Sequence, residues 1–138
     1  MKKLVPISLA LLAALFLAVS AYAAERTFTV TMTGKAETPK GDPDGKGTAK
    51  LKIEASKGEV CYTLSWHKIG KPLAAHIHKG NKGKAGPIVV PLFAGTAKHS
   101  GCVKASKSLL GKIVKNPKSY YVNIHTQRFP GGALRGQL

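Results

Sequence analysis

Two histidines separated by a single residue, His76 and His78, have a type and spacing that could do chemistry. On a β-strand, residues two positions apart point to the same face, so both imidazole rings would lie on one side of a sheet. Neutral imidazole is a good ligand for copper, zinc and nickel. The pair could therefore form part of a metal site, while solvated or hydrogen-bonded histidines on a half-exposed strand are the alternative.

A third histidine, His125, lies in a second segment that alternates in the same way. In the run YYVNIHT, Tyr121, Asn123 and His125 would share one face, with the intervening valine and isoleucine on the other. If the apolar residues of both segments point into a core, His76, His78 and His125 all lie on outer faces. If the two strands are also neighbours, we expect these histidines to form a surface site for copper, with zinc as the alternative.

The end of the chain could bring a positive charge to the same place. Pro130 followed by two glycines predicts a tight turn, which would return the final segment 133–138 alongside 120–126. In that hairpin Arg135 would lie beside His125, where its guanidinium could steer an anion toward a bound metal. A surface arginine paired with a carbonyl or carboxylate is the alternative.

Most of the chain alternates apolar and polar residues with the period of two that indicates a half-buried β-strand. In RTFTVTMT, Phe28, Val30 and Met32 alternate with threonines. Lys57-Gly58 has the form of a two-residue hairpin turn between two such segments. The strands expected from this pattern cover residues 26–33, 47–56, 59–69, 74–78, 88–93, 101–105, 120–126 and 133–138.

One segment has helical periodicity instead. In SKSLLGKIVKNP the apolar residues recur at i, i+1, i+4 and i+5, which is one face of a helix, and Asn116-Pro117 would end it. Ser106 or Ser108 could cap its N-terminus. We therefore predict a mostly β fold, an antiparallel Greek-key β-sandwich or barrel with one short helix near residues 106–115.

The N-terminus has the three parts of a secretory signal peptide. Two lysines precede an apolar run over residues 4–19, and small residues follow up to Ala23. We expect residues 1–23 to be a signal peptide and residues 24–138 to form a single domain that is periplasmic or secreted. An uncleaved anchor is the alternative, and no later segment is long enough to span a bilayer.

Two cysteines, Cys61 and Cys102, follow the predicted cleavage point. In an exported protein such a pair usually forms a disulfide, and the loop that it would close predicts about 3–4 kcal/mol of stabilisation. Two buried free thiols are the alternative.

The charge is strongly basic, with a formal net charge of +16 at pH 7. The lysines are scattered and arginines are few, which argues against sequence-specific nucleic-acid recognition. A basic surface on a soluble exported protein is the simplest interpretation. The functional alternative is attraction to an anionic small molecule or to a cell-envelope component such as lipid or acidic polysaccharide. With six acidic residues and no Ser-His-Asp arrangement, we set aside a hydrolytic enzyme.

Several blocks of the sequence resemble the CHRD (chordin-type) domain family. AAHIHKGNKGKAGPIVVPLF and NPKSYYVNIHTQRFPGGALRGQL are similar to its two signature blocks, and MTGKAETP and GKGTAKLKI to its opening block and next strand. The likeness covers about residues 28–138 and implies an antiparallel β fold in a secreted or exported protein. The motif residues that it carries over are Glu37, His76, His78, Gly86, Pro87, Asn123, His125, Pro130, Gly131, Gly132, Arg135 and Gly136.

The chain departs from the family pattern at one position. Many relatives have an acidic residue two positions before the motif arginine, whereas this chain has Ala133 before Arg135. The resemblance therefore does not supply Arg135 with that carboxylate as a partner.

A weaker likeness concerns the copper site of copper–zinc superoxide dismutases. Those proteins bind copper through an H-x-H on a strand and a later histidine, with an arginine near the open metal position and an intrachain disulfide. His76-x-His78, His125, Arg135 and the cysteine pair are similar in kind and order. The bridging histidine and the zinc-site aspartate have no counterpart here, so the likeness is an analogy of sites.

Two hypotheses of function follow. The first is an exported protein that binds copper through the three histidines as a carrier or small redox enzyme, with Arg135, Asn123 and Glu37 orienting ligands or steering an anion. The second is a non-catalytic module that binds protein, glycan or anionic lipid. The sequence does not decide whether the protein is an enzyme.

Overall fold

The computed structural model describes residues 25–138, and the predicted signal peptide lies outside the described residues. The strands are β1 (Glu25–Thr33), β2 (Lys46–Glu54), β3 (Glu59–His67), β4 (Pro72–Lys79), β5 (Ile88–Ala94), β6 (Ser100–Lys104), β7 (Tyr120–Thr126) and β8 (Leu134–Gln137). The helix α1 spans Lys107–Lys115, and three short 3-10 turns are η1 (Gly34–Ala36), η2 (Ala55–Lys57) and η3 (Pro117–Ser119). Each predicted strand corresponds to one of these strands, with ends shifted by a few residues.

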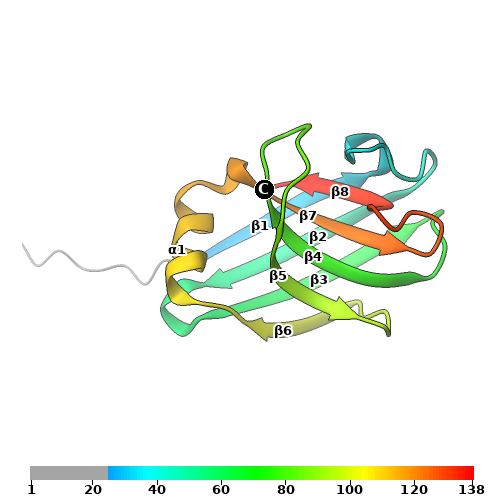
Figure 1. The fold of residues 1–138 in the computed structure, drawn as a ribbon. Coiled ribbons are helices and arrows are strands. Elements are labelled where there is room, and N and C mark those ends of the chain that lie inside the picture. The colour runs from blue at the N-terminus through cyan, green and yellow to red at the C-terminus, as the bar shows by residue number, and fades with distance from the viewer. Residues whose placement is uncertain (1–24) are drawn as a thin grey trace, which may run out of the picture.

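All eight strands belong to one antiparallel sheet, in the order β5-β4-β7-β8-β1-β2-β3-β6. The sheet curls into a nearly closed barrel, and its two edge strands, β5 and β6, contact each other (Figure 1). The connections from β3 to β4 and from β6 to β7 each join two strands that are not neighbours in this order. The predicted mostly β, antiparallel architecture with one short helix is confirmed for the described part of the chain.

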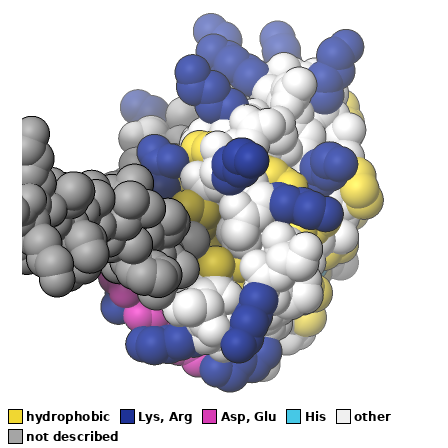
Figure 2. All heavy atoms as spheres, turned by 90° about the vertical axis from the view of Figure 1, so that its left-hand side faces the viewer, with side chains coloured by type: hydrophobic (Ala, Val, Ile, Leu, Met, Phe, Trp, Pro, Cys, Tyr) yellow, Lys and Arg dark blue, Asp and Glu magenta, His cyan; other side chains and the backbone are white. Residues whose placement is uncertain are grey.

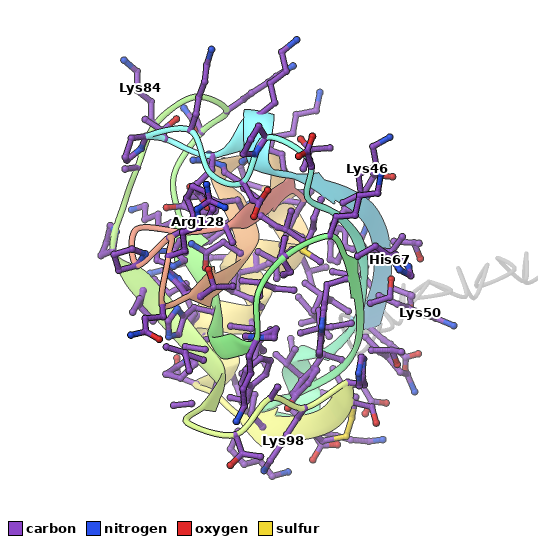
Figure 3. The ribbon with its side chains drawn as sticks, turned by 90° about the vertical axis from the view of Figure 1, so that its right-hand side faces the viewer. Lys46, Lys50, His67, Lys84, Lys98 and Arg128 are labelled. Carbon is purple, nitrogen blue, oxygen red and sulfur yellow. A yellow bond between two sulfur atoms is a disulfide. The ribbon has the colours of Figure 1, made fainter. Side chains whose placement is uncertain are left out.

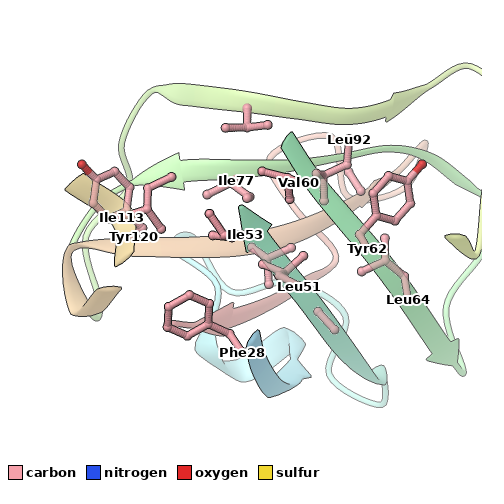
Figure 4. Packing of buried hydrophobic residues seen from close by; sticks show 14 of the residues in the cluster. Phe28, Leu51, Ile53, Val60, Tyr62, Leu64, Ile77, Leu92, Ile113 and Tyr120 are labelled. Carbon is pink, nitrogen blue, oxygen red and sulfur yellow. The ribbon is translucent and has the colours of Figure 1, made fainter. Parts of the chain in front are cut away.

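The barrel interior is filled by the apolar residues of the alternating strands. Leu51 and Ile53 of β2, Val60 of β3 and Ile77 of β4 are completely buried and pack together (Figure 4). Burial of one such side chain stabilises the fold by about 1.5–3 kcal/mol. The period of two therefore determines which face of each strand is left for polar residues.

Helix α1 closes one end of the barrel. Its inward-facing side chains, Leu110 and Ile113, are completely buried. Its N-terminus is capped by Ser106, whose side chain accepts a hydrogen bond of 3.2 Å from the backbone N–H of Leu109. This confirms one of the two caps that the sequence allows.

The β2–β3 connection is longer than predicted. Glu54 pairs with Glu59, so four residues rather than two form the turn. Ala55 is buried against α1 at the start of η2, and Gly58 then reverses the chain with φ of 63°. Burial of Ala55 beneath α1 favours a 3-10 turn over the two-residue turn expected from Lys57-Gly58.

The predicted disulfide is present. Cys61 of β3 and Cys102 of β6 are directly opposite each other and are covalently joined. The bond therefore fixes an edge strand to the sheet. Within residues 25–138, no helix has both the length and the hydropathy needed to cross a membrane.

Candidate metal centre

The register of three neighbouring strands arranges the predicted site residues in rows. His76 of β4 lies opposite Asn123 of β7, and Asn123 lies opposite Arg135 of β8. In the next row, His78 lies opposite Tyr121. Residues directly opposite in an antiparallel pair share a face, so the rows form one polar surface on these strands.

That surface is on the outside of the barrel, as predicted. Ile77, Val122 and Ile124 are completely buried on the other face. The expectation of a surface site is nevertheless wrong for His78, which is only 7% exposed. The loop 80–87 between β4 and β5, hereafter the covering loop, hydrogen-bonds to His78 through Gly86 (Figure 1).

His76, His78 and His125 lie in one cluster. One ring nitrogen from each lies within 4.8 Å of those from the other two. The shortest separation, 3.0 Å, is between His76 Nδ1 and His125 Nε2. His125 is diagonal to His76 across the β4–β7 pair, which is close enough for long side chains to meet.

Backbone carbonyls lie beside one ring nitrogen of His78 and one of His125. His78 Nδ1 lies 2.8 Å from the carbonyl oxygen of Gly86, and His125 Nδ1 lies 2.8 Å from that of Pro130. A carbonyl oxygen only accepts, so His78 Nδ1 donates its proton and His78 Nε2 keeps a lone pair. Both ring nitrogens of His125 face acceptor oxygens, that of Pro130 at Nδ1 and Asn123 Oδ1 at Nε2, so these contacts do not fix its tautomer. Among the residues that the structure describes, His78 Nε2 is the one buried side-chain nitrogen or oxygen without a hydrogen-bond partner.

The cluster environment keeps the imidazole rings of His76 and His125 neutral. Burial, followed by the neighbouring His125 and His78 rings, lowers the pKa of His76 from 6.5 to about 4. Burial also lowers the pKa of His125, against the opposing effect of its hydrogen bond to Pro130. Metal ligation requires a neutral ring, so His76 and His125 have the required protonation state at pH 7.

Asn123 and Glu37 form a buried chain that leads to His125. Asn123 donates to Glu37 Oε2 at 3.3 Å, and its Oδ1 lies 3.0 Å from His125 Nε2. Burial raises the pKa of the Glu37 carboxyl, although the Thr38 N–H, Asn123 and Arg135 oppose this. Gly132, with φ of 128°, is required here because a Cβ at this position would overlap the Glu37 carboxylate.

The guanidinium of Arg135 is occupied by the covering loop. Arg135 is 1% exposed and donates to the carbonyl oxygens of Lys84 and Asn81, both at 2.8 Å. Its Cζ lies 3.5 Å from the centroid of the Tyr121 ring, which in turn stacks on His78 at 4.8 Å. Arg135 thus holds the loop that covers His78.

Gln137 and Tyr121 also support the site, although the sequence-based reasoning assigned them no such role. Gln137 donates to the carbonyl of Gly80, and the Tyr121 hydroxyl accepts from the Gly86 N–H at 3.2 Å. Both residues share a strand face with the site residues, and this alternation in the sequence was the signal that could have identified them. Their long-range partners are set by the covering loop, whose course strand periodicity does not describe.

A second group with metal-ligand side chains, Glu59 with Cys61 and Cys102, lies across β3 and β6. Both sulfurs are in the disulfide and therefore offer no thiolate to a metal.

Among the comparisons with known proteins, the scan against family models identifies a family. The family model described as the CHRD domain matches residues 28–138. That range begins in β1 and contains all the cluster residues. No curated protein and no solved structure matches the chain at a significant level.

Proposed function

The chain belongs to the CHRD family, and on this premise we propose that it is an exported protein that binds a transition metal through His76, His78 and His125. Copper is the first choice of metal and zinc the second. With the metal bound, the protein acts as a metal carrier or as a small redox enzyme.

The observation that carries this proposal is the lone pair on His78 Nε2. A buried nitrogen without a partner is costly, by about 1–3 kcal/mol, and a metal ion would satisfy it. Histidine ligands in metal sites commonly donate their other N–H to a carbonyl, as His78 does to Gly86.

The donor spacing supports the same conclusion. Nitrogens bound to one ion at 2.0–2.1 Å are separated from each other by roughly 3 Å. His76 Nδ1 and His125 Nε2 are 3.0 Å apart. Imidazole suits both copper and zinc, and divalent copper binds a given nitrogen site more tightly than zinc.

Three protein ligands leave a coordination position for a further ligand. A carrier uses that position to pass the metal to a partner, and a redox enzyme uses it to bind a substrate. His76 and His125 are only half-buried, which supports access to the cluster from solvent.

Export is part of the proposal. The Cys61–Cys102 disulfide supports it because such bonds persist in oxidising compartments. The expected leader supports it from the sequence.

The test is a metal titration of the protein without its leader, by calorimetry, with Cu(II), Cu(I) and Zn(II). We expect stoichiometric sub-micromolar binding by the native protein and its loss in the His76→Ala/His78→Ala variant. The matched control is His67→Ala/His99→Ala, which removes two histidines outside the cluster. Circular dichroism checks that both variants are folded. Equal weak binding by all three proteins would refute the metal site.

A further inference from the structure

A groove of about 610 Å³ lies beside β8, and none of the three histidines lines it. One wall is the segment from Lys35 to Lys40, and the other is the tip of the covering loop at Lys82 and Gly83. Arg135 of β8 lies at its base. The metal site proposed above does not use this groove.

The groove has an excess of positive charge. Lys35, Lys40 and Lys82 are exposed around it, and the Arg135 guanidinium lies buried beneath them. Glu37 is the one carboxylate among the lining residues, and it is hydrogen-bonded to Thr38 and Asn123.

Acidic residues pair with lysines elsewhere. Within residues 25–138, the ion pairs of the structure join Glu25, Glu54 and Glu59 to lysines of β2, η2 and β6. The three groove lysines have no such pair in this range. Figure 2 shows an excess of basic side chains on the α1 side, where they are scattered over the face and the few acidic ones lie at its lower left.

The available donors favour a particular kind of anion. The Arg135 fork is occupied by carbonyls of the covering loop, so it is not free for bidentate binding of a planar carboxylate. The three lysines are mobile point charges that can surround an anion with oxygens on several sides, as a phosphate has.

We propose that this groove binds a phosphate-bearing anion through Lys35, Lys40 and Lys82. The phosphate belongs either to a free small molecule or to the headgroup of an anionic lipid. This inference goes beyond the proposed metal site and shares none of its ligands.

The test compares two triple variants with the same change in net charge. Lys35→Gln/Lys40→Gln/Lys82→Gln removes the groove amines. Lys50→Gln/Lys98→Gln/Lys107→Gln removes three exposed lysines away from the groove, and Lys98 lies at the opposite end of the molecule from Lys84 of the covering loop (Figure 3). The probes are inorganic pyrophosphate, by calorimetry, and phosphatidylglycerol vesicles, by flotation, both at physiological salt.

We expect the groove variant to lose affinity about tenfold or more and the control variant to change about twofold or less. Binding of pyrophosphate assigns the site to free phosphates, and binding of vesicles alone assigns it to a lipid headgroup. Equal losses in both variants, or no binding of either probe by the native protein, would overturn the proposal. Both probes are applied to metal-free protein, which separates this result from that of the metal titration.

Discussion

At His78, the Nδ1 proton is directed to the Gly86 carbonyl, and the Nε2 lone pair is buried near two other imidazole rings. His125 Nδ1 likewise lies beside the Pro130 carbonyl, but His125 Nε2 also faces the Asn123 Oδ1 acceptor, so its tautomer does not follow from these contacts. Residue types alone do not determine tautomers, because these depend on which acceptor each ring meets. The Gly86 carbonyl thus leaves the His78 Nε2 lone pair available within the histidine cluster.

Stability should depend on pH through His76. Its folded pKa of about 4 is below the ordinary value of 6.5, so between these pH values the unfolded chain binds a proton that the folded protein does not. The contribution is complete above pH 6.5, and the free energy of unfolding should fall as pH falls from 6.5 toward 4. Urea unfolding of metal-free protein at several pH values measures this slope.

The His76→Gln variant is the control for that measurement. It should show a shallower decrease in the free energy of unfolding over the same pH range. The raised pKa of Glu37 contributes with the opposite sign, since the folded protein then binds the extra proton, and it is present in both proteins. Identical slopes would contradict the assignment to His76.

At the scale of elements, the covering loop and β8 form a unit. Arg135 and Gln137 on β8 donate to loop carbonyls, and Gly86 of the loop donates to Tyr121. A Cβ at Gly86 would overlap the Lys79 carbonyl, so this close approach requires glycine. The loop is therefore positioned by its contacts with β8 and β7 and not by its own propensity.

Arg135→Lys should loosen this loop. Lysine keeps the charge but lacks the fork that reaches both the Lys84 and Asn81 carbonyls, so we expect a loss of about 2–3 kcal/mol in the free energy of unfolding. Amide hydrogen exchange over residues 80–86 should become faster. Exposed Arg128→Lys is the matched control and should change stability by about 0.5 kcal/mol or less. If both variants behave alike, Arg135 does not hold the loop.

Helix α1 allows a stabilising substitution. Gly111 lies within the helix, and a Cβ built on it meets no atom within 4 Å. Gly111→Ala should raise the free energy of unfolding by about 0.5–1 kcal/mol, because alanine loses less backbone entropy. Gly101→Ala in β6 should instead destabilise, since its Cβ would lie 2.8 Å from the Tyr62 hydroxyl. Thermal unfolding compares the two, and a lower melting temperature for Gly111→Ala would contradict the prediction.

At the scale of the whole molecule, the disulfide and the disposition of charge are global features. The bond spans 41 residues and ties edge strand β6 to β3. Cys61→Ala/Cys102→Ala should lower the free energy of unfolding by about 3–4 kcal/mol, from the added entropy of the unfolded chain. Chemical denaturation of the two proteins measures this, and a loss below about 1 kcal/mol would show that the closed loop adds little.

Much of the fold was predictable because its causes are local. The period of two located all the strands, and the i, i+4 pattern located α1, whose cap it left between Ser106 and Ser108. The same period correctly placed Ile77 and Val122 inside the barrel, and hence the histidines outside it. The prediction of a two-residue β2–β3 turn was wrong because the burial of Ala55 against α1 is a tertiary effect.

The sequence by itself determined which residues share a face of each strand, because the direction of a side chain on a strand depends only on its position along it. It also identified the disulfide pair and the net charge. Only the tertiary structure decided that β4, β7 and β8 are neighbours in this register, which brings His76 within 3.0 Å of His125. It also decided that Arg135 binds the covering loop, because strand pairing and loop closure depend on contacts between residues far apart in the chain.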